Sequence, residues 1–244
     1  MTNPPTHKQK YVPQFDGALR NHMVQVPVCI SEASGIRIFG RRIKSFAFTT
    51  DVAIIRNINA DAIIAVYPFS PQPAITRAIM SAAVMPVLVG VGGGVTTGDR
   101  VVSLACDAEH EGAFGVVVNA PTENQTIRRL SQNLDIPIVV SVISEWTDIQ
   151  SRLDAGTNIL NVSAAAKTPM VVRSIRERYP TIPIIATGGP TDESITETIR
   201  AGANAITYTP PSNGELFAIS MNRYRKKEDE DHLSASASDK TKHV

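Results

Sequence analysis

The chain lacks a cysteine framework, an excess of charge of either sign, and a long apolar run. Its 244 residues include only two cysteines, Cys29 and Cys106, which lie in hydrophobic surroundings and form no CxxC motif. This usage excludes a disulfide-built scaffold and is typical of a reducing compartment. Lysine and arginine number 24 against 23 aspartate and glutamate residues, so charge gives no reason to expect nucleic acid or an acidic membrane as the main partner.

No segment is suited to entering or crossing a membrane. The longest apolar stretches, such as Met80–Val91, contain proline and glycine and are shorter than the roughly 20 residues of a membrane span. The first ten residues, MTNPPTHKQK, lack the apolar region of a signal peptide. Hydrophobic residues make up 43% of the chain and charged residues 19%, which is ordinary for a globular protein. We therefore expect a soluble, cytoplasmic protein.

The chain does contain one regular alternation of short apolar runs with longer amphipathic stretches. The runs are rich in Val, Ile, Leu and Ala, as expected of parallel strands buried on both faces. The predicted strands are Phe46–Thr49, Ala62–Val66, Val87–Val91, Phe114–Val118, Ile138–Val142, Ile159–Val162, Ile184–Thr187 and Ala205–Thr209. Eight βα units in one continuous run predict an α/β protein with a single (β/α)8 TIM barrel. The alternative, an open doubly wound sheet, would normally carry a GxGxxG motif after its first strand, and this sequence has none there.

Helix boundaries are signalled at several positions between these runs. Ser70-Pro71 and Thr168-Pro169 each predict an N-cap followed by a first-turn proline. Thr122–Gln125 and Thr147–Gln150 fit the capping box, in which the first and fourth side chains satisfy each other's free amides.

Glycines predict where three of the helices end. Gly112, Gly156 and Gly202 stand at expected helix ends. Two of them belong to a weak internal repeat, because Ala155–Asn158 and Ala201–Asn204 both read Ala-Gly-x-Asn directly before a predicted strand. The repeat supports a succession of equivalent βα units.

The ends of the chain differ from its middle. Residues 1–14 are polar and proline-rich, and residues 225–244 form a mixed charge run with a Ser/Ala/Lys tail, so we expect a mobile N-terminus and a charged, disordered C-terminal tail. For the charge run, a solvated helix end is the alternative. Residues 15–224 are then the barrel with an N-terminal cap segment. Within it, Val26–Ile30 and Ile36–Phe39 are expected to form a small hairpin that covers the barrel bottom.

An anion site is predicted at the end of the run Ile184–Thr187. Active sites of TIM barrels lie at the C-terminal ends of the strands, and phosphate commonly binds between the last two loops. Paired glycines there let backbone amides approach an anion at the start of the next helix. The predicted phosphate-binding residues are Thr187, Gly188, Gly189, Thr191, Thr209, Ser212, Asn213 and Gly214. The alternative is that Gly188 and Gly189 merely make a tight turn.

Other polar or glycine residues that follow predicted strands are candidates for binding substrate. The glycine cluster Gly92–Gly94 could form an anion nest or let substrate lie against the backbone, and its alternative is a flexible loop. Side chains that end strands face the barrel mouth, unless they only cap local loops. The predicted substrate-binding residues are Tyr67, Gly92, Gly93, Gly94, Asn119, Asn161 and Ser163.

Three charged residues near the strand ends are the candidates for catalysis. Asp51 and Glu145 could transfer protons, and Lys167 could neutralise phosphate or polarise a carbonyl. Each has a structural alternative: Asp51 complements the dipole of a helix, and Glu145 and Lys167 are solvated surface residues. None of the five histidines follows a predicted strand, which argues against a histidine-ligated metal or a Ser/His or Cys/His couple.

The ATGGPT turn at Ala186–Thr191, the AGANAIT segment at Ala201–Thr207 and the short βα units resemble aldolase-type, phosphate-binding TIM barrels over residues 44–222. That group includes thiamine-phosphate synthase and the 2-keto-3-deoxy-6-phosphogluconate aldolases, and the chain is also similar to a bacterial family with only a generic hydrolase label. The resemblance implies phosphate contact by Gly188, Gly189 and the loop Ser212–Gly214. The Schiff-base aldolases of that group carry a lysine in the sixth strand, whereas Asn158–Ser163 here contains none.

Together these features predict an enzyme that acts on a small phosphorylated metabolite by aldolase-type, lyase or hydrolase chemistry. The alternative is a non-catalytic sensor that binds the same kind of metabolite, since isolated carboxylates make a thin catalytic set and a fold alone does not decide function. No cofactor and no metal site are predicted. The sequence leaves open a need for Mg²⁺, the substrate and a homo-oligomeric state.

Overall fold

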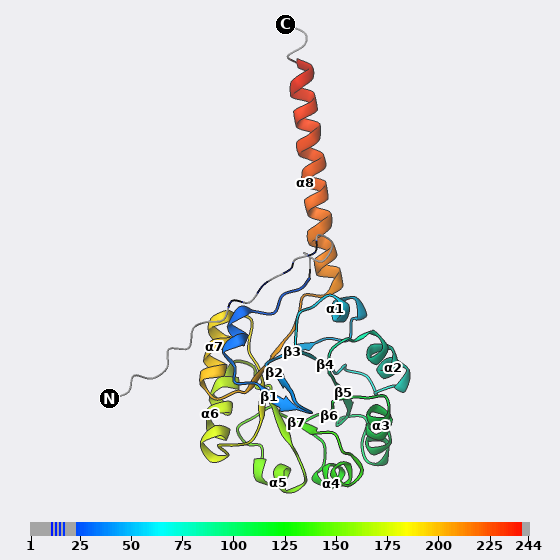
Figure 1. The fold of residues 1–244 in the computed structure, drawn as a ribbon, viewed down its shortest axis with the longest axis vertical. Coiled ribbons are helices and arrows are strands. Elements are labelled where there is room, and N and C mark those ends of the chain that lie inside the picture. The colour runs from blue at the N-terminus through cyan, green and yellow to red at the C-terminus, as the bar shows by residue number, and fades with distance from the viewer. Residues whose placement is uncertain (1–10, 12, 14, 16, 18–22, 241–244) are drawn as a thin grey trace, which may run out of the picture.

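Eight parallel strands close into a barrel in the computed structural model, which describes residues 11, 13, 15, 17 and 23–240 (Figure 1). The barrel strands are β3 (Ser45–Phe48), β4 (Ala62–Ala65), β5 (Val87–Gly92), β6 (Gly115–Val118), β7 (Ile138–Val142), β8 (Ile159–Val162), β9 (Ile184–Thr187) and β10 (Ala205–Tyr208). The barrel closes where β10 pairs with β3, with Ile206 opposite Ser45. The predicted TIM barrel is confirmed, and every predicted strand lies within one residue of its observed bounds.

Helices surround the barrel in the alternating order of the fold (Figure 1). They are α1 (Val52–Arg56), α2 (Pro73–Ala82), α3 (Asp99–His110), α4 (Asn124–Asn133), α5 (Ile149–Asp154), α6 (Thr168–Arg178), α7 (Asp192–Arg200) and α8 (Asn213–Lys240). A 3-10 helix, η2 (Ala165–Lys167), precedes α6. Outward-facing strand residues such as Val89 and Leu160 pack against the helices. Inward-facing ones such as Leu88 and Ile159 form a separate core inside the barrel, as the two-residue period of a strand requires.

The Ala-Gly-x-Asn repeat has a structural role that the two copies share. Asn158 Oδ1 accepts from the Ile138 amide at 2.8 Å, and Asn204 Oδ1 accepts from the Ile184 amide at 3.0 Å. Each asparagine precedes one strand and holds the first residue of the strand before it. The glycines Gly112, Gly156 and Gly202 follow helix ends with φ of 87°, 109° and 113°, which confirms the predicted helix stops.

Three of the predicted helix starts are wrong by one or two residues. Helix α2 begins at Pro73 after Gln72 rather than at Ser70-Pro71, and α4 is preceded by Glu123 rather than capped by Thr122. Helix α5 is capped by Asp148, which accepts from the Ser151 amide at 3.1 Å, and not by Thr147.

Two threonines at predicted helix starts make other contacts instead of capping. Thr122 is buried against Gly93, where it cannot reach the free amides of α4. Thr168 and Pro169 do start α6, but Thr168 Oγ1 accepts backward from the Ala164 amide at 3.0 Å instead of capping the helix.

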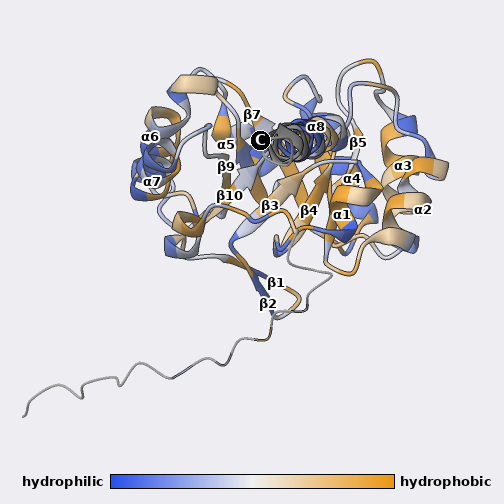
Figure 2. Ribbon diagram, turned by 90° about the horizontal axis from the view of Figure 1, so that it is seen from above, coloured by the Kyte–Doolittle hydropathy of each residue, from blue (hydrophilic) through white to orange (hydrophobic). Residues whose placement is uncertain are grey.

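A short hairpin closes the N-terminal end of the barrel (Figure 2). Its arms are β1 (Ile36–Ile38) and β2 (Arg41–Ile43), which pair antiparallel with Ile36 opposite Ile43. Both isoleucines are buried in the same cluster as Phe46 at the start of the barrel. The predicted first arm, Val26–Ile30, is wrong, because Val28–Glu32 forms the 3-10 helix η1 and packs beside α7.

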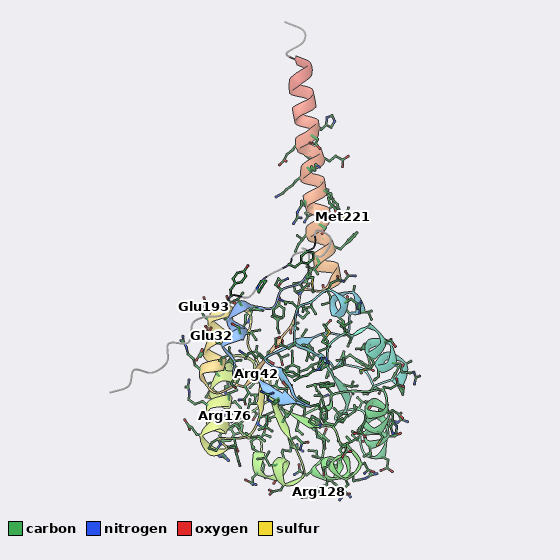
Figure 3. The ribbon with its side chains drawn as sticks, viewed as in Figure 1. Glu32, Arg42, Arg128, Arg176, Glu193 and Met221 are labelled. Carbon is green, nitrogen blue, oxygen red and sulfur yellow. The ribbon has the colours of Figure 1, made fainter. Side chains whose placement is uncertain are left out.

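Helix α8 leaves the barrel and projects far beyond it (Figure 1). Its first turns contact the barrel through Leu216, and beyond Met221 every side chain from Asn222 to His232 is exposed (Figure 3). The expected disordered tail is therefore helical up to Lys240, as in the alternative of a solvated helix end. Opposite charges four residues apart, as at Arg225 and Asp229, favour a helix here.

The structure tests the expectations about the chain ends and about membrane spans only in part. Most of residues 1–14, and residues 241–244, lie outside the described part of the chain. In the described part, no helix combines the length and the apolar character needed to span a bilayer.

Candidate active site

A cavity of about 200 Å³ opens at the C-terminal ends of β4, β5 and β6. Five of the predicted substrate-binding residues, Tyr67, Gly92, Gly93, Gly94 and Asn119, line it together. They come from three successive loops, so the fold gathers residues that are up to 52 positions apart in the sequence. The sequence analysis missed other lining residues, of which Phe69, Ser70 and Thr96 lie two or three positions after predicted ones.

The glycine loop after β5 is locked against the loop after β6. Gly92 and Gly93 have φ of 143° and 94°, and a Cβ on Gly93 would collide with Thr122 Oγ1 and lie 2.7 Å from the Asn119 nitrogen. The Gly93 amide donates to Thr96 O at 2.9 Å, and the Asn119 amide donates to Gly92 O at 3.0 Å. These contacts make the loop a fixed wall of the cavity. Because the Gly93 amide already donates within the loop, it is not free to bind a ligand.

Arg152 supports this wall from outside the cavity. Its guanidinium donates to Thr122 O, to Asn124 Oδ1 at 2.8 Å and to Ala120 O at 2.8 Å. Partial burial lowers the pKa of this guanidinium from its ordinary value, but an arginine remains charged at neutral pH. Nothing in the sequence points to this role, because the acceptors lie about 30 residues earlier in the chain.

Eight uncharged residues, one from each barrel strand or directly after it, face the barrel axis near the mouth, and together they are called the ring. Each stands two residues after a member of the inner core and therefore also faces inward. From β3 to β10 the ring consists of Phe48, Val66, Gly90, Asn119, Ser141, Asn161, Thr187 and Thr207. Val66, Gly90 and Asn119 also line the cavity, so the cavity reaches down to this ring.

Two oxygens of the ring are buried without a hydrogen-bond partner among the described residues: Asn161 Oδ1 and Thr207 Oγ1. Asn161 lies opposite Ser141 on the neighbouring strand, and Thr207 lies opposite Thr187. The polar side of the ring therefore consists of two pairs, one on β7 and β8 and one on β9 and β10, and Ile185 stands opposite Asn161 between them. Of these four, the sequence analysis assigned Asn161 to substrate and Thr187 to phosphate, and it missed Ser141 and Thr207.

The structure pairs two of the three catalytic candidates and separates the third. Lys167 Nζ lies 3.8 Å from Glu145 Oε1, at the rim beyond β7 and β8. Asp51 follows β3, which stands four strands from β7 in the eight-stranded barrel and hence across the mouth. Its Oδ1 accepts from the amides of Ala53 at 2.8 Å and Ile54 at 3.2 Å. Asp51 therefore caps helix α1, in line with its structural alternative.

The predicted phosphate loops follow the neighbouring strands β9 and β10, so they lie side by side. At the first, Thr191 and Ser194 form a capping box: Thr191 Oγ1 accepts from the Ser194 amide at 3.3 Å, and Ser194 Oγ accepts from the Thr191 amide at 3.2 Å. A Cβ on Gly188 would lie 2.7 Å from Ile195 Cγ1, so this glycine also lets α7 pack closely. Glu193 stands in the first turn of α7 (Figure 3), and backbone hydrogen bonding lowers its pKa from the ordinary value.

The second phosphate loop is closed by a similar arrangement. The Ser212 amide and hydroxyl both donate to Glu215 Oε2 at 2.7 Å, and the Glu215 amide donates to Ser212 Oγ at 3.2 Å. The hydrogen bond from the Ser212 side chain lowers the pKa of Glu215. An anion at these loops would therefore bind beside carboxylates. The backbone amides left to hold it would be those of Gly189, Asn213 and Gly214. Thr209 and Ser163 are exposed at the ends of their strands.

The residues present do not form a Mg²⁺ site by themselves. Among residues 23–240 and the few described before them, no three or more His, Cys, Asp or Glu side chains come together. The ring offers only amide and hydroxyl oxygens, whereas Mg²⁺ in proteins is usually held through carboxylates.

Comparison with known proteins finds neither a matching family model nor a matching curated protein. Solved structures do match. A putative phosphonomutase from Burkholderia cenocepacia is 15% identical, with a TM-score of 0.57 over 82% of this chain and 96% of that one. A phosphonopyruvate hydrolase in complex with oxalate and Mg²⁺ is 14% identical, with a TM-score of 0.56 over 78% and 83%.

A regulatory protein has the same architecture. The glycerol uptake operon antiterminator regulatory protein from Listeria monocytogenes is 13% identical, with a TM-score of 0.52 over 70% of this chain and 95% of that one. At such identities these comparisons establish that the chain has the TIM barrel fold.

Proposed function

We propose that this protein is an enzyme that acts on a small phosphorylated metabolite by lyase-type or hydrolase chemistry. The observation that carries the proposal is the cavity at the C-terminal ends of β4, β5 and β6, whose lining includes Asn119 and the ring residues Val66 and Gly90 beside it. TIM barrels place their active sites at this end. Barrels of similar fold include a phosphonomutase and a phosphonopyruvate hydrolase, which supports this class of chemistry.

The phosphate group binds at the two loops after β9 and β10. Each of these loops leads into a helix, α7 or α8, and helix N-termini favour anions. Gly189 has φ of 85°, and a Cβ there would lie 2.6 Å from Ser194 Oγ, so the turn into α7 requires glycine. Phosphate bound here extends the metabolite across the mouth toward the cavity, because β9 stands four strands from β5.

Glu145 and Lys167 supply the chemistry at the rim between these two subsites. The ammonium of Lys167 offsets negative charge that develops on the metabolite, and Glu145 takes up or returns the proton. Strand β8 carries no lysine, so the amine does not come from the position used by the Schiff-base aldolases that the sequence resembles. Asp51 stabilises α1 through its capping hydrogen bonds and has no role in the proposed reaction.

The test combines binding and turnover on the full-length protein. A thermal-shift screen with phosphorylated metabolites identifies a ligand, since saturation at 100 times Kd adds about 2.7 kcal/mol of stability. Glu145→Gln and Lys167→Met should then lower turnover about 100-fold or more while binding persists. The exposed Glu177→Gln on α6 serves as the control. The absence of any phosphorylated ligand, or full turnover in both variants, would overturn the proposal.

The second candidate is a sensor that binds the metabolite without converting it. Its specific support is the uncharged ring, together with the separation of Asp51 from Glu145 across the mouth. A regulatory protein with the same fold shows that such barrels are not confined to enzymes. Tight binding without turnover of any bound metabolite would favour the sensor.

A further inference from the structure

The ring below the mouth holds buried oxygens that have no partner in the described chain. Thr207 is 7% exposed, and its Oγ1 makes no hydrogen bond within the described chain. Asn161 Oδ1 is also a buried oxygen without a partner there. Buried polar atoms are normally hydrogen-bonded, and each exception calls for an explanation. A ligand that reaches the ring would supply the missing partners.

These oxygens belong to a wider patch with one kind of chemistry. Ser141 and Thr187 stand opposite them on neighbouring strands, so four successive strands present a hydroxyl or an amide to the barrel axis. On the other side of the ring, Gly90 has no side chain, and Val66 and Gly90 form part of the cavity wall. Strands β4 and β5, which carry this part of the cavity wall, stand across the barrel from β8 and β9, which carry Asn161 and Thr187.

The chemistry of the patch matches hydroxyl groups and not anions. Ser, Thr and Asn side chains both donate and accept, as an alcohol does. No ring member is cationic, and a carboxylate or phosphate buried among neutral groups would lose hydration without gaining a counter-charge. The helix N-termini lie outside the ring, after the strands end.

We propose that the ring binds the hydroxylated carbon chain of the ligand, with Asn161 and Thr207 as its specificity-determining residues. The metabolite is then a sugar or polyol phosphate and not a keto-acid phosphate. This inference rests on the proposed function for the phosphate end, which binds at the loops after β9 and β10. The ring itself requires no phosphate.

The test compares four probes on the wild-type protein and its variants by calorimetry and thermal shift: ribose 5-phosphate, phosphoenolpyruvate, inorganic phosphate and ribitol. Thr207→Val and Asn161→Leu remove the hydrogen-bonding groups with little change in shape. Thr157→Val is the matched control, because Thr157 Oγ1 is also buried without a partner but precedes β8 at the opposite end of the barrel.

The wild-type protein should bind ribose 5-phosphate more tightly than phosphoenolpyruvate. Each ring variant should weaken ribose 5-phosphate and ribitol about threefold to tenfold, with inorganic phosphate unchanged. The Thr157→Val protein should bind all probes as the wild type does.

The outcomes separate this inference from the proposed function. Phosphate compounds that bind equally well to the wild type and the ring variants would overturn the inference alone, as would a preference for phosphoenolpyruvate. Ribitol binding that depends on Thr207, without any response to phosphate compounds, would overturn the proposed function. It would still support the inference that the ring binds hydroxyl groups. If no probe binds, both are overturned.

Discussion

Arg176, on α6 (Figure 3), holds the start of β10 through Asn204: its Nη2 lies 2.7 Å from Asn204 Oδ1, the same oxygen that accepts from the Ile184 amide of β9. The guanidinium also donates to Gly202 O at 2.8 Å and to Ile182 O at 2.9 Å. One side chain thus links a helix to the beginnings of two barrel strands.

Replacing Arg176 by leucine should lower the free energy of unfolding by about 2–4 kcal/mol. The variant leaves partly buried carbonyls without these donors, and hydrogen bonds to a charged group contribute more than neutral ones. Chemical denaturation measures the effect, with Arg173→Leu as the control because Arg173 is exposed on the same helix. Equal stability of the two variants would contradict the role of Arg176.

Thr207→Val should stabilise the ligand-free protein. The hydroxyl is buried without a partner, and removing it relieves a desolvation cost of about 1–3 kcal/mol while the β-branched shape still suits a strand. The melting temperature should rise by about 2–4 °C per kcal/mol in a protein of this size. Thr157→Val should give a gain of the same sign, whereas a loss in Thr207→Val would mean that the hydroxyl already has a partner.

Gly93 and Gly94 should respond in opposite ways to alanine. Gly93 has φ of 94°, and its added Cβ would collide with Thr122 and Asn119, so Gly93→Ala should cost about 2–3 kcal/mol and narrow the cavity. Gly94 has open space around it and lies outside the positive-φ region, so Gly94→Ala should be neutral or stabilise by about 0.4–1 kcal/mol. Denaturation curves of the two variants test this. Tolerance of Gly93→Ala would mean that the loop is mobile.

The barrel strands could be predicted from the sequence because their signal is local. Strands buried on both faces read as uninterrupted Val, Ile and Ala runs, and the run Ile138–Val142 matches β7 residue for residue. Helix ends marked by glycine, such as the one at Gly156, are likewise a local signal, because a positive φ depends on the residue type at a single position.

The features that the sequence did not predict depend on distant contacts. Thr122 looks like a cap, but Gly93, 29 residues earlier, holds it in the loop wall. The acceptors of Arg152 are separated from it by 28 to 32 residues. Thr207 lies within a strand, so a reading confined to residues after each strand passes over it, whereas the two-residue period counted from Ala205 would have found it.

Glu215 should make the stability of the protein depend on pH in the acidic range. Its pKa is lowered in the folded state by the hydrogen bonds from Ser212, so the folded protein favours the carboxylate. That contribution is fully present above the unfolded-state pKa and is lost as the pH falls through the lowered folded-state pKa. Melting temperatures from about pH 7 to about pH 3 should therefore fall less steeply in Glu215→Gln than in the wild type. Parallel curves would show that Glu215 makes no such contribution.

Glu215→Gln should also strengthen phosphate binding at the start of α8. The carboxylate accepts from the Ser212 amide and hydroxyl and places negative charge at a helix N-terminus that the proposed function assigns to phosphate. Glutamine keeps an acceptor for Ser212 but removes the charge that repels the anion, so calorimetry should show about twofold to fivefold tighter binding of inorganic phosphate, decreasing with added salt. Glu228→Gln is the matched control, since it removes the same charge about 20 Å further along the same helix. An equal gain in both variants would reflect only the net charge of the protein, and no gain in either would place phosphate elsewhere.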